Sequence, residues 1–143
     1  MRVVLDTSVV ITAIRSSAGA AAEIVRLALL RKLTILMDYK FSSEYRAVAL
    51  RKQPIAASGK TYAELTLLLD TLEAIAEPVL VSVQHHPLSQ DANDDMVLDV
   101  AINAGADAIV TGNIKHFLEP ARRFQLNLLT PPELLHEFRR RNP

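Results

Sequence analysis

The chain has 143 residues, of which 50% are hydrophobic and 22% are charged, and its 16 basic and 16 acidic residues leave no net charge. This composition is typical of a globular domain with a buried core and excludes an intrinsically disordered chain. The balanced charge gives no global basic field of the kind that marks many nucleic-acid-binding proteins. Because cysteine is absent, disulfides, cysteine-ligated zinc and thiol nucleophiles are excluded.

The start of the chain, MRVVLD, lacks a signal-peptide pattern, and no apolar run reaches membrane-spanning length. We therefore expect a soluble, cytoplasmic protein with no membrane contact. No repeat, linker or low-complexity segment divides the sequence, so we expect a single domain over residues 1–143.

Short apolar runs alternate with longer helical patterns. The runs are nearly continuous rather than alternating, which is typical of parallel strands covered on both faces. The alternation predicts an α/β fold, a three-layer α/β/α sandwich around a parallel sheet. In chain order we expect a strand at 2–5, helices at 9–14 and 19–31, a strand at 33–37, helices at 42–52 and 60–76, a strand at 79–83, a helix at 93–105, strands at 107–112 and 126–130, and a helix at 132–141 capped by Thr130.

The first expected strand leads directly into Asp6, which is followed by Thr7 and Ser8. Functional residues gather at the carboxyl ends of strands in open parallel sheets, so Asp6 is a candidate site residue. It is equally a candidate N-cap of the next helix. The sequence leaves both interpretations open.

The segment QDANDDMVLDVA concentrates Asp91, Asp94, Asp95 and Asp99 where a helix begins. Capping and the helix dipole explain Asp91 well. On a helical wheel Asp94 falls within the apolar arc, whereas Asp95 and Asp99 fall on the other side and are expected to face solvent. A carboxylate turned toward a core needs a partner, or its pKa must rise, so capping does not explain Asp94.

Glu44 follows the second expected strand, near the start of a helix that Ser42 or Ser43 can cap. Taken alone, it is an ordinary glutamate favoured by the helix dipole. However, Asp6, Glu44 and Asp94 are all expected at one edge of the sheet, where their charges would repel. A hard divalent cation resolves that repulsion, so we predict bound Mg²⁺ or Mn²⁺ and phosphodiester hydrolysis by metal-activated water.

The segment IVTGN ends a strand in Thr111, Gly112 and Asn113. Gly112 permits a tight turn or the close approach of a phosphate, and Asn113 can hydrogen-bond a ligand carboxylate or a metal-bound water. The alternative is an ordinary turn between a strand and a helix.

Together these segments resemble the PIN-domain family of metal-dependent ribonucleases, and more closely its branch of toxin components of type II toxin–antitoxin systems. The matching motifs are VVLDTSV, SSEYRAVAL, DANDDMVLDVAINAGADAIVTGN and LLTPPELL, in family order over nearly the whole chain. The resemblance implies a parallel sheet of four or five strands, an RNA substrate, a homodimer, and a small antitoxin that covers or enters the acidic cleft. It implies catalytic roles for Asp6, Glu44 and Asp94, metal ligation by Asp6, Asp94 and Asp91, and support from Thr7, Ser8, Thr111 and Asn113.

The sequence departs from the family at Asn113, where many relatives carry aspartate. Asparagine supplies no charge, so we expect a second metal ion to bind weakly or only with substrate. His116 also stands where relatives often carry aspartate, and we expect it at the surface rather than as a ligand.

Other interpretations remain open. His85 and His86 can join Asp91 as transition-metal ligands, and Asp38 is a helix cap or a neighbour of the acidic site. A haloacid-dehalogenase-like phosphatase would use Asp6 as a nucleophile, although position 8 is serine rather than aspartate and Lys115 is only a loose candidate for the lysine. A non-enzymatic alternative is a weakened PIN-like binding module that acts through a protein partner.

Clustered carboxylates destabilise a fold that lacks its metal, which gives a test of Asp94. We predict that Asp94→Asn leaves the melting temperature of the metal-free protein unchanged or raises it. Thermal denaturation in EDTA measures this. A large drop would instead identify Asp94 as a structural cap or hydrogen-bonding hub.

Overall fold

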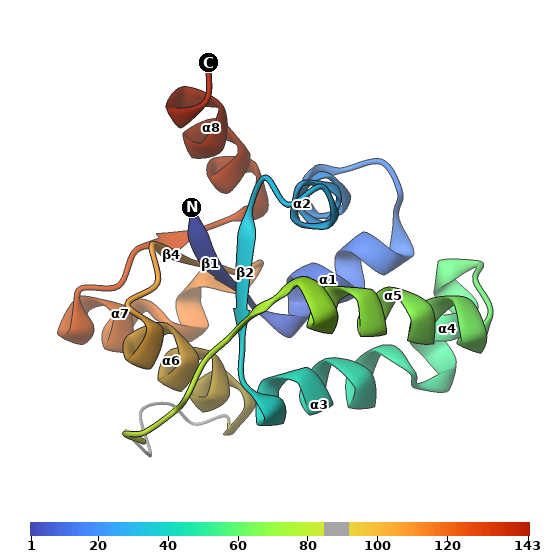
Figure 1. Cartoon of the computed structure of the whole chain (residues 1–143), viewed down its shortest axis with the longest axis horizontal. Coiled ribbons are helices and arrows are strands. Elements are labelled where there is room, and N and C mark those ends of the chain that lie inside the picture. Colours follow the sequence, from blue (N-terminus) through green and yellow to red (C-terminus); the bar gives the residue numbers. More distant parts are fainter. Residues whose placement is uncertain (85–91) are drawn as a thin grey trace.

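Five parallel strands form the sheet in the computed structural model, which describes residues 1–84 and 92–143. The strands are β1 (Arg2–Leu5), β2 (Thr34–Met37), β3 (Glu77–Pro78), β4 (Ala108–Val110) and β5 (Leu128–Leu129). Their order across the sheet is β3-β2-β1-β4-β5, and every neighbouring pair is parallel (Figure 1). The predicted parallel α/β fold is therefore confirmed.

Helices lie on both sides of this sheet. Helix α6 packs against β1, β2 and β4, while α1 packs against β1 and α2, and α2 also contacts α5 and α8. Figure 1 shows α6 and α7 to one side of the strands and α1, α2 and α5 to the other. The helices are α1 (Thr7–Arg15), α2 (Ala20–Leu29), α3 (Tyr39–Ala49), α4 (Lys52–Ser58), α5 (Tyr62–Ile75), α6 (Ala92–Ala104), α7 (Leu118–Phe124) and α8 (Pro131–Arg141), with a short 3₁₀ helix, η1 (Ile114–His116).

The core explains why the central strands were predictable. Val3, Val4 and Leu5 of β1 are at most 1% exposed, and the three residues of β4 are buried equally completely. A strand covered on both faces reads as an uninterrupted apolar run. Within the described ranges, no single helix is long and apolar enough to cross a membrane. Helices α1 and α2 reach that length and apolar composition only when taken together, and they are bent by 102° relative to each other.

The strand predicted at 79–83 is wrong. Strand β3 comprises only Glu77 and Pro78, paired with Leu36 and Met37 of β2. The Val79 amide still donates to the Met37 carbonyl at 2.9 Å, but β2 ends at Met37. Because the neighbouring chain turns into α3 there, residues 80–83 have no strand left to pair with.

The start of one predicted helix is wrong, and three helices were missed. The helix expected at 42–52 begins earlier, at Tyr39, because Asp38 caps it by accepting from the Phe41 amide at 2.8 Å. Asp38 is thus the cap, not Ser42 or Ser43. Helix α4 was missed although Pro54 in its first turn and Gly59 after its end are recognisable signals. Helix α7 and η1 were missed as well.

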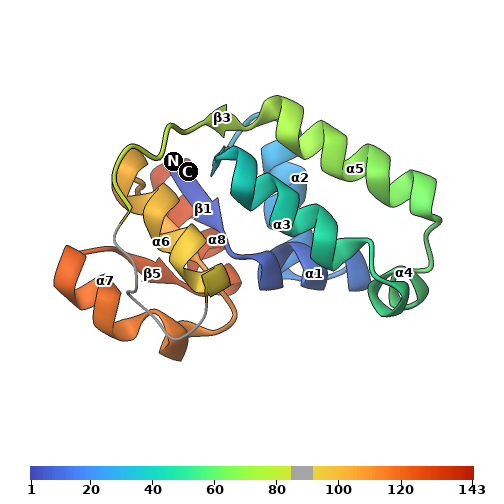
Figure 2. The same cartoon turned by 90° about the horizontal axis from the view of Figure 1, so that it is seen from below.

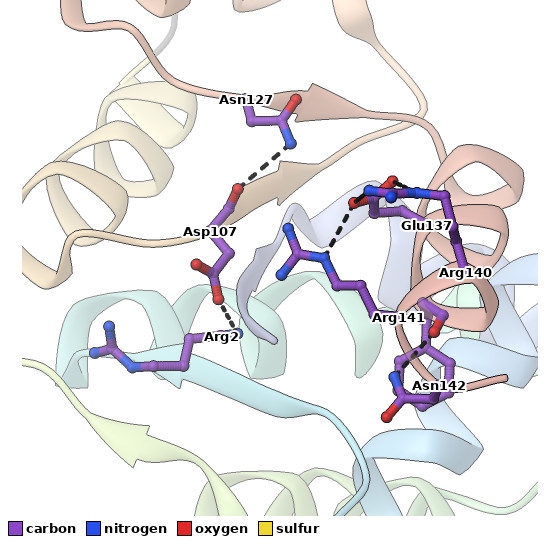
Figure 3. Close-up of polar contacts among 8 residues, drawn as sticks. Arg2, Asp107, Asn127, Glu137, Arg140, Arg141 and Asn142 are labelled. Atoms are coloured by element: carbon purple, nitrogen blue, oxygen red, sulfur yellow. Dashed lines mark hydrogen bonds and ion pairs between the residues drawn. The ribbon is translucent and has the colours of Figure 1, made fainter.

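The amino-terminal edge of the sheet is tied by polar contacts of Arg2 and Asp107. The Arg2 amide donates to the Asp107 carboxylate at 2.7 Å, and the Asn127 side-chain amide donates to the Asp107 carbonyl at 3.5 Å (Figure 3). The Arg2 guanidinium pairs with Glu77, which lowers the pKa of that carboxyl. These contacts join β1 to the segments before β4 and β5, so this edge is structural.

The basic residues at the end of α8 are solvent-exposed and form ion pairs within their own helix. Arg140 and Arg141 both pair with Glu137 on their own helix, at 2.6 and 3.0 Å (Figure 3). The N-cap predicted at Thr130 is confirmed, since its hydroxyl accepts from the Glu133 amide in a capping box.

Tyr45 connects α3 to the end of β1. Its buried hydroxyl donates to the Leu5 carbonyl, and its ring packs on Phe41 with 4.5 Å between centroids. Burial first, and then the negative charge of Asp6, raise the pKa of the Tyr45 hydroxyl well above its usual value. Helix α3 is therefore held beside the carboxyl end of β1.

This contact predicts a measurable cost for Tyr45→Phe. Removal of the buried hydroxyl should lower the free energy of unfolding by about 1–2 kcal/mol, because the Leu5 carbonyl loses a donor. Urea denaturation measures the change. Tyr39→Phe on the same helix, where the side chain is 85% exposed, should have no effect, and equal effects of the two substitutions would contradict the assignment.

Candidate active site at the carboxyl edge of the sheet

The connections of the sheet reverse direction between β1 and β4. From β1 the chain proceeds outward to β2 and β3, and it then returns to β4 on the other side of β1. Ligands of open α/β sheets bind at such a switch point, outside the carboxyl ends of the strands. Asp6 and Thr111 directly follow these two strands, and the Asp6 amide donates to the Val110 carbonyl at 2.9 Å.

Asp6 is buried and its carboxylate is held by hydroxyl groups. Only 7% of Asp6 is exposed. Its Oδ2 accepts from the Ser8 hydroxyl at 2.8 Å and from the Thr111 hydroxyl at 2.7 Å. Asp6 occupies the N-cap position of α1, but its side chain makes no capping hydrogen bond, so capping does not account for its carboxylate. Of the two hydroxyls predicted to support Asp6, Ser8 makes the contact.

Three further carboxylates, all on α6, are buried. Asp94, Asp95 and Asp99 are 8%, 4% and 4% exposed. Burial of Asp94 agrees with its place in the apolar arc. The expectation that Asp95 and Asp99 face solvent is wrong.

The packing of other segments against α6 was not visible in the sequence. Asp95, Asp99 and Asn103 are spaced four residues apart and share one face of the helix. The Asn103 amide group accepts from the Val83 amide at 3.1 Å and donates to the Val83 carbonyl at 2.7 Å, so the extended chain after β3 lies across this face. Helical periodicity describes one helix and contains no information about a distant segment that covers it.

Glu44 lies in the second turn of α3 and is half-buried. The next residue, Tyr45, contacts the last residue of β1, so α3 passes close to Asp6. Ser42 has a structural role, since its hydroxyl donates to Glu73 of α5 at 2.5 Å. This contact and the Arg46 guanidinium lower the pKa of the Glu73 carboxyl.

The segment from Thr111 to His116 makes contacts to two of the buried acids. Thr111 bonds Asp6, as described, and it accepts from the Asn113 amide at 2.9 Å. Asn113 itself is an exposed residue. At the end of the segment, Nδ1 of His116 lies 3.2 Å from Oδ2 of Asp94. Sequence reasoning placed His116 at the surface and missed this contact, for which no local signal exists.

The donor set suits a hard divalent cation, because carboxylate oxygens are the ligands that Mg²⁺ and Mn²⁺ prefer. Within residues 1–84 and 92–143, no three acidic or histidine side chains form a ready metal-binding group. Asp91, His85 and His86 lie outside the described residues. Mg²⁺ usually retains several waters and uses one or two protein carboxylates, so such an ion does not require a group of three protein ligands.

The hydroxyl of Thr111 gives a test of the buried network. Thr111 is fully buried, and Thr111→Val keeps its shape while removing one donor from a carboxylate. We expect the free energy of unfolding to fall by about 1.5–3 kcal/mol, the range for hydrogen bonds to charged groups.

The matched control is Thr66→Val in α5, because the buried Thr66 hydroxyl has no hydrogen-bond partner among the described residues. That substitution should be neutral or stabilising. Urea denaturation of both variants measures the difference, and a neutral Thr111→Val would contradict the role given to its hydroxyl.

Comparison with known proteins places this geometry in a family. The PIN domain family matches residues 2–115. Among solved structures, VapBC2 from Rickettsia felis, bound to a DNA fragment from its promoter, is similar with a TM-score of 0.56 and 21% identity, over 91% of this chain and 98% of that one. No curated protein sequence gives a significant match. The motifs, the parallel sheet and the family match agree: the chain belongs to the PIN-domain family.

Proposed function

We propose that this PIN-domain protein is an endoribonuclease that hydrolyses RNA phosphodiester bonds with a divalent metal ion, Mg²⁺ or Mn²⁺. The observation that carries the proposal is the buried carboxylate of Asp6 at the switch point of the sheet. Its hydrogen bonds come from hydroxyl groups, which orient the carboxylate without cancelling its charge. A buried negative charge of this kind favours a cation.

Asp6 and Asp94 are the residues that would hold the ion, with Glu44 and Asp91 as further acids predicted from the resemblance. When bound, such an ion activates water for attack on phosphorus and neutralises charge on the phosphate oxygens. The chain itself orients Asp6 through Ser8 and Thr111. A further carboxylate of the site would accept a proton from the attacking water.

An aspartyl-phosphate mechanism is less well supported. Position 8 is Ser8, whose hydroxyl donates to Asp6 at 2.8 Å, where such phosphatases carry a second aspartate. Oδ2 of Asp6 also accepts from Thr111, and two donors to one oxygen reduce its nucleophilicity. Attack by metal-activated water forms no covalent bond to a carboxylate oxygen.

We also propose that the protein is the toxin of a toxin–antitoxin pair. The similar structure is described as VapBC2, a complex, and the motifs resemble toxin components of such systems. A small antitoxin would inhibit by covering or entering the acidic site. The homodimer predicted from the resemblance belongs to the same proposal. The alternative, suggested by Asn113, is a weakened binding module that acts through a protein partner.

Cleavage of a single-stranded RNA oligonucleotide by the purified chain tests the proposed activity. We expect cleavage in Mn²⁺ that EDTA abolishes, and a loss of at least about 100-fold in kcat/KM for Asp6→Asn, because a metal ligand is weakened. Asp70→Asn on the exposed face of α5 is the control and should retain activity.

Two results would redirect the proposal. Unchanged cleavage by Asp6→Asn would show that the site is elsewhere, and a trapped phosphoryl group on Asp6 would favour the phosphatase. If the purified chain cleaves no RNA with Mg²⁺ or Mn²⁺ but binds a small partner protein tightly, the binding module is favoured.

A further inference from the structure

His116 contacts Asp94 in a way that fixes the direction of its ring. Nδ1 of His116 lies 3.2 Å from Oδ2 of Asp94, and the two side chains are 53% and 11% exposed. When Asp94 is ionised its carboxylate only accepts hydrogen bonds, and Nδ1 then carries the proton. This is true of the imidazolium and of one neutral tautomer, and the contact therefore does not depend on the charge of the ring.

The backbone that presents His116 is anchored in the core. The His116 amide donates to the Asn113 carbonyl at 3.0 Å, and the Phe117 amide donates to the Ile114 carbonyl at 3.0 Å. Phe117, the next residue, is completely buried. An exposed ring on an anchored turn can therefore hold a neighbouring carboxylate with little loss of entropy.

The same short segment, residues 111–116, contacts the other candidate metal ligand. Thr111 donates to Asp6 at 2.7 Å, and the Gly112 amide lies 3.4 Å from the Ser8 hydroxyl, which also donates to Asp6. One segment thus makes contacts to the carboxylate of Asp6, directly after β1, and to that of Asp94 in α6. Partners that orient metal ligands in this way change metal affinity by about 10–100-fold when removed.

We propose that His116 is a positioning residue of the metal site: its Nδ1–H orients the Asp94 carboxylate relative to Asp6 for binding of the divalent ion. This inference rests on the proposed function, since it requires that Asp6 and Asp94 hold the ion. His116 is not itself one of the acidic residues proposed to hold the ion. The role is carried by a hydrogen-bond donor.

Two substitutions separate the donor from the ring. His116→Phe keeps a ring of similar shape without the donor, whereas His116→Asn can place an amide N–H at the position of Nδ1. We expect His116→Phe to weaken Mn²⁺ binding about tenfold or more, and His116→Asn to stay within about threefold of the unsubstituted chain. Isothermal titration of the full chain with Mn²⁺, without RNA, measures both affinities.

His136→Phe provides the control, because His136 is exposed on α8, and it should leave Mn²⁺ affinity unchanged. Melting curves in EDTA check that all three variants fold. Mn²⁺ affinity of His116→Phe equal to that of the unsubstituted chain overturns the inference. Equal weakening by His116→Phe and His116→Asn also overturns it, because the ring and not the donor would then matter.

The outcomes for this inference and for the proposed function are distinct. If the unsubstituted chain binds Mn²⁺ and cuts RNA while His116→Phe binds Mn²⁺ equally well, only the role of His116 fails. If the unsubstituted chain does not bind Mn²⁺, or binds it no better than Asp6→Asn, the proposed metal centre fails and the role of His116 fails with it.

Discussion

The burial of carboxylates beside the carboxyl ends of β1 and β4 is the constraint on which the site depends. An ionised carboxylate loses much solvation free energy when it leaves water, and it must recover that energy from donors or from a cation. Asp6 recovers part of it from two hydroxyl groups at 2.7 and 2.8 Å. Neutral donors orient the carboxylate without neutralising it, which is the property that the proposed metal site requires.

The topology of the sheet gives this constraint its location. Because the chain returns across β1 to form β4, residues that are 105 positions apart meet in the contact between Thr111 and Asp6. On the other side, Tyr45 fastens α3 to the last residue of β1. Figure 2 shows α3 and α6 flanking the end of β1. The carboxylate of Asp6 is therefore fixed by packed elements on several sides, which is the preorganisation that an active site requires.

Sequence patterns predicted those parts of the site that depend on one element at a time. Asp6 was predictable because a continuous apolar run ends at it, and Asp94 because it falls in the apolar arc of α6. Asp95 and Asp99 were not, since their burial depends on tertiary packing around α6 that a helical wheel does not contain. The false strand at 79–83 has the same origin: apolar content does not show whether a neighbouring strand remains to pair with. The contact of His116 with Asp94 likewise follows no periodicity.

Asn113 shows how the segment 111–116 keeps its structural role without a charge. Its backbone amide donates to the Thr111 hydroxyl, which donates to Asp6, so each hydrogen bond polarises the next. Its carbonyl accepts from the His116 amide and so fixes the turn that presents the ring to Asp94. Any residue with an N–H supplies these contacts. Asparagine in place of aspartate therefore lacks only the negative charge, and in the proposed metal centre the lower charge would favour one divalent ion over two.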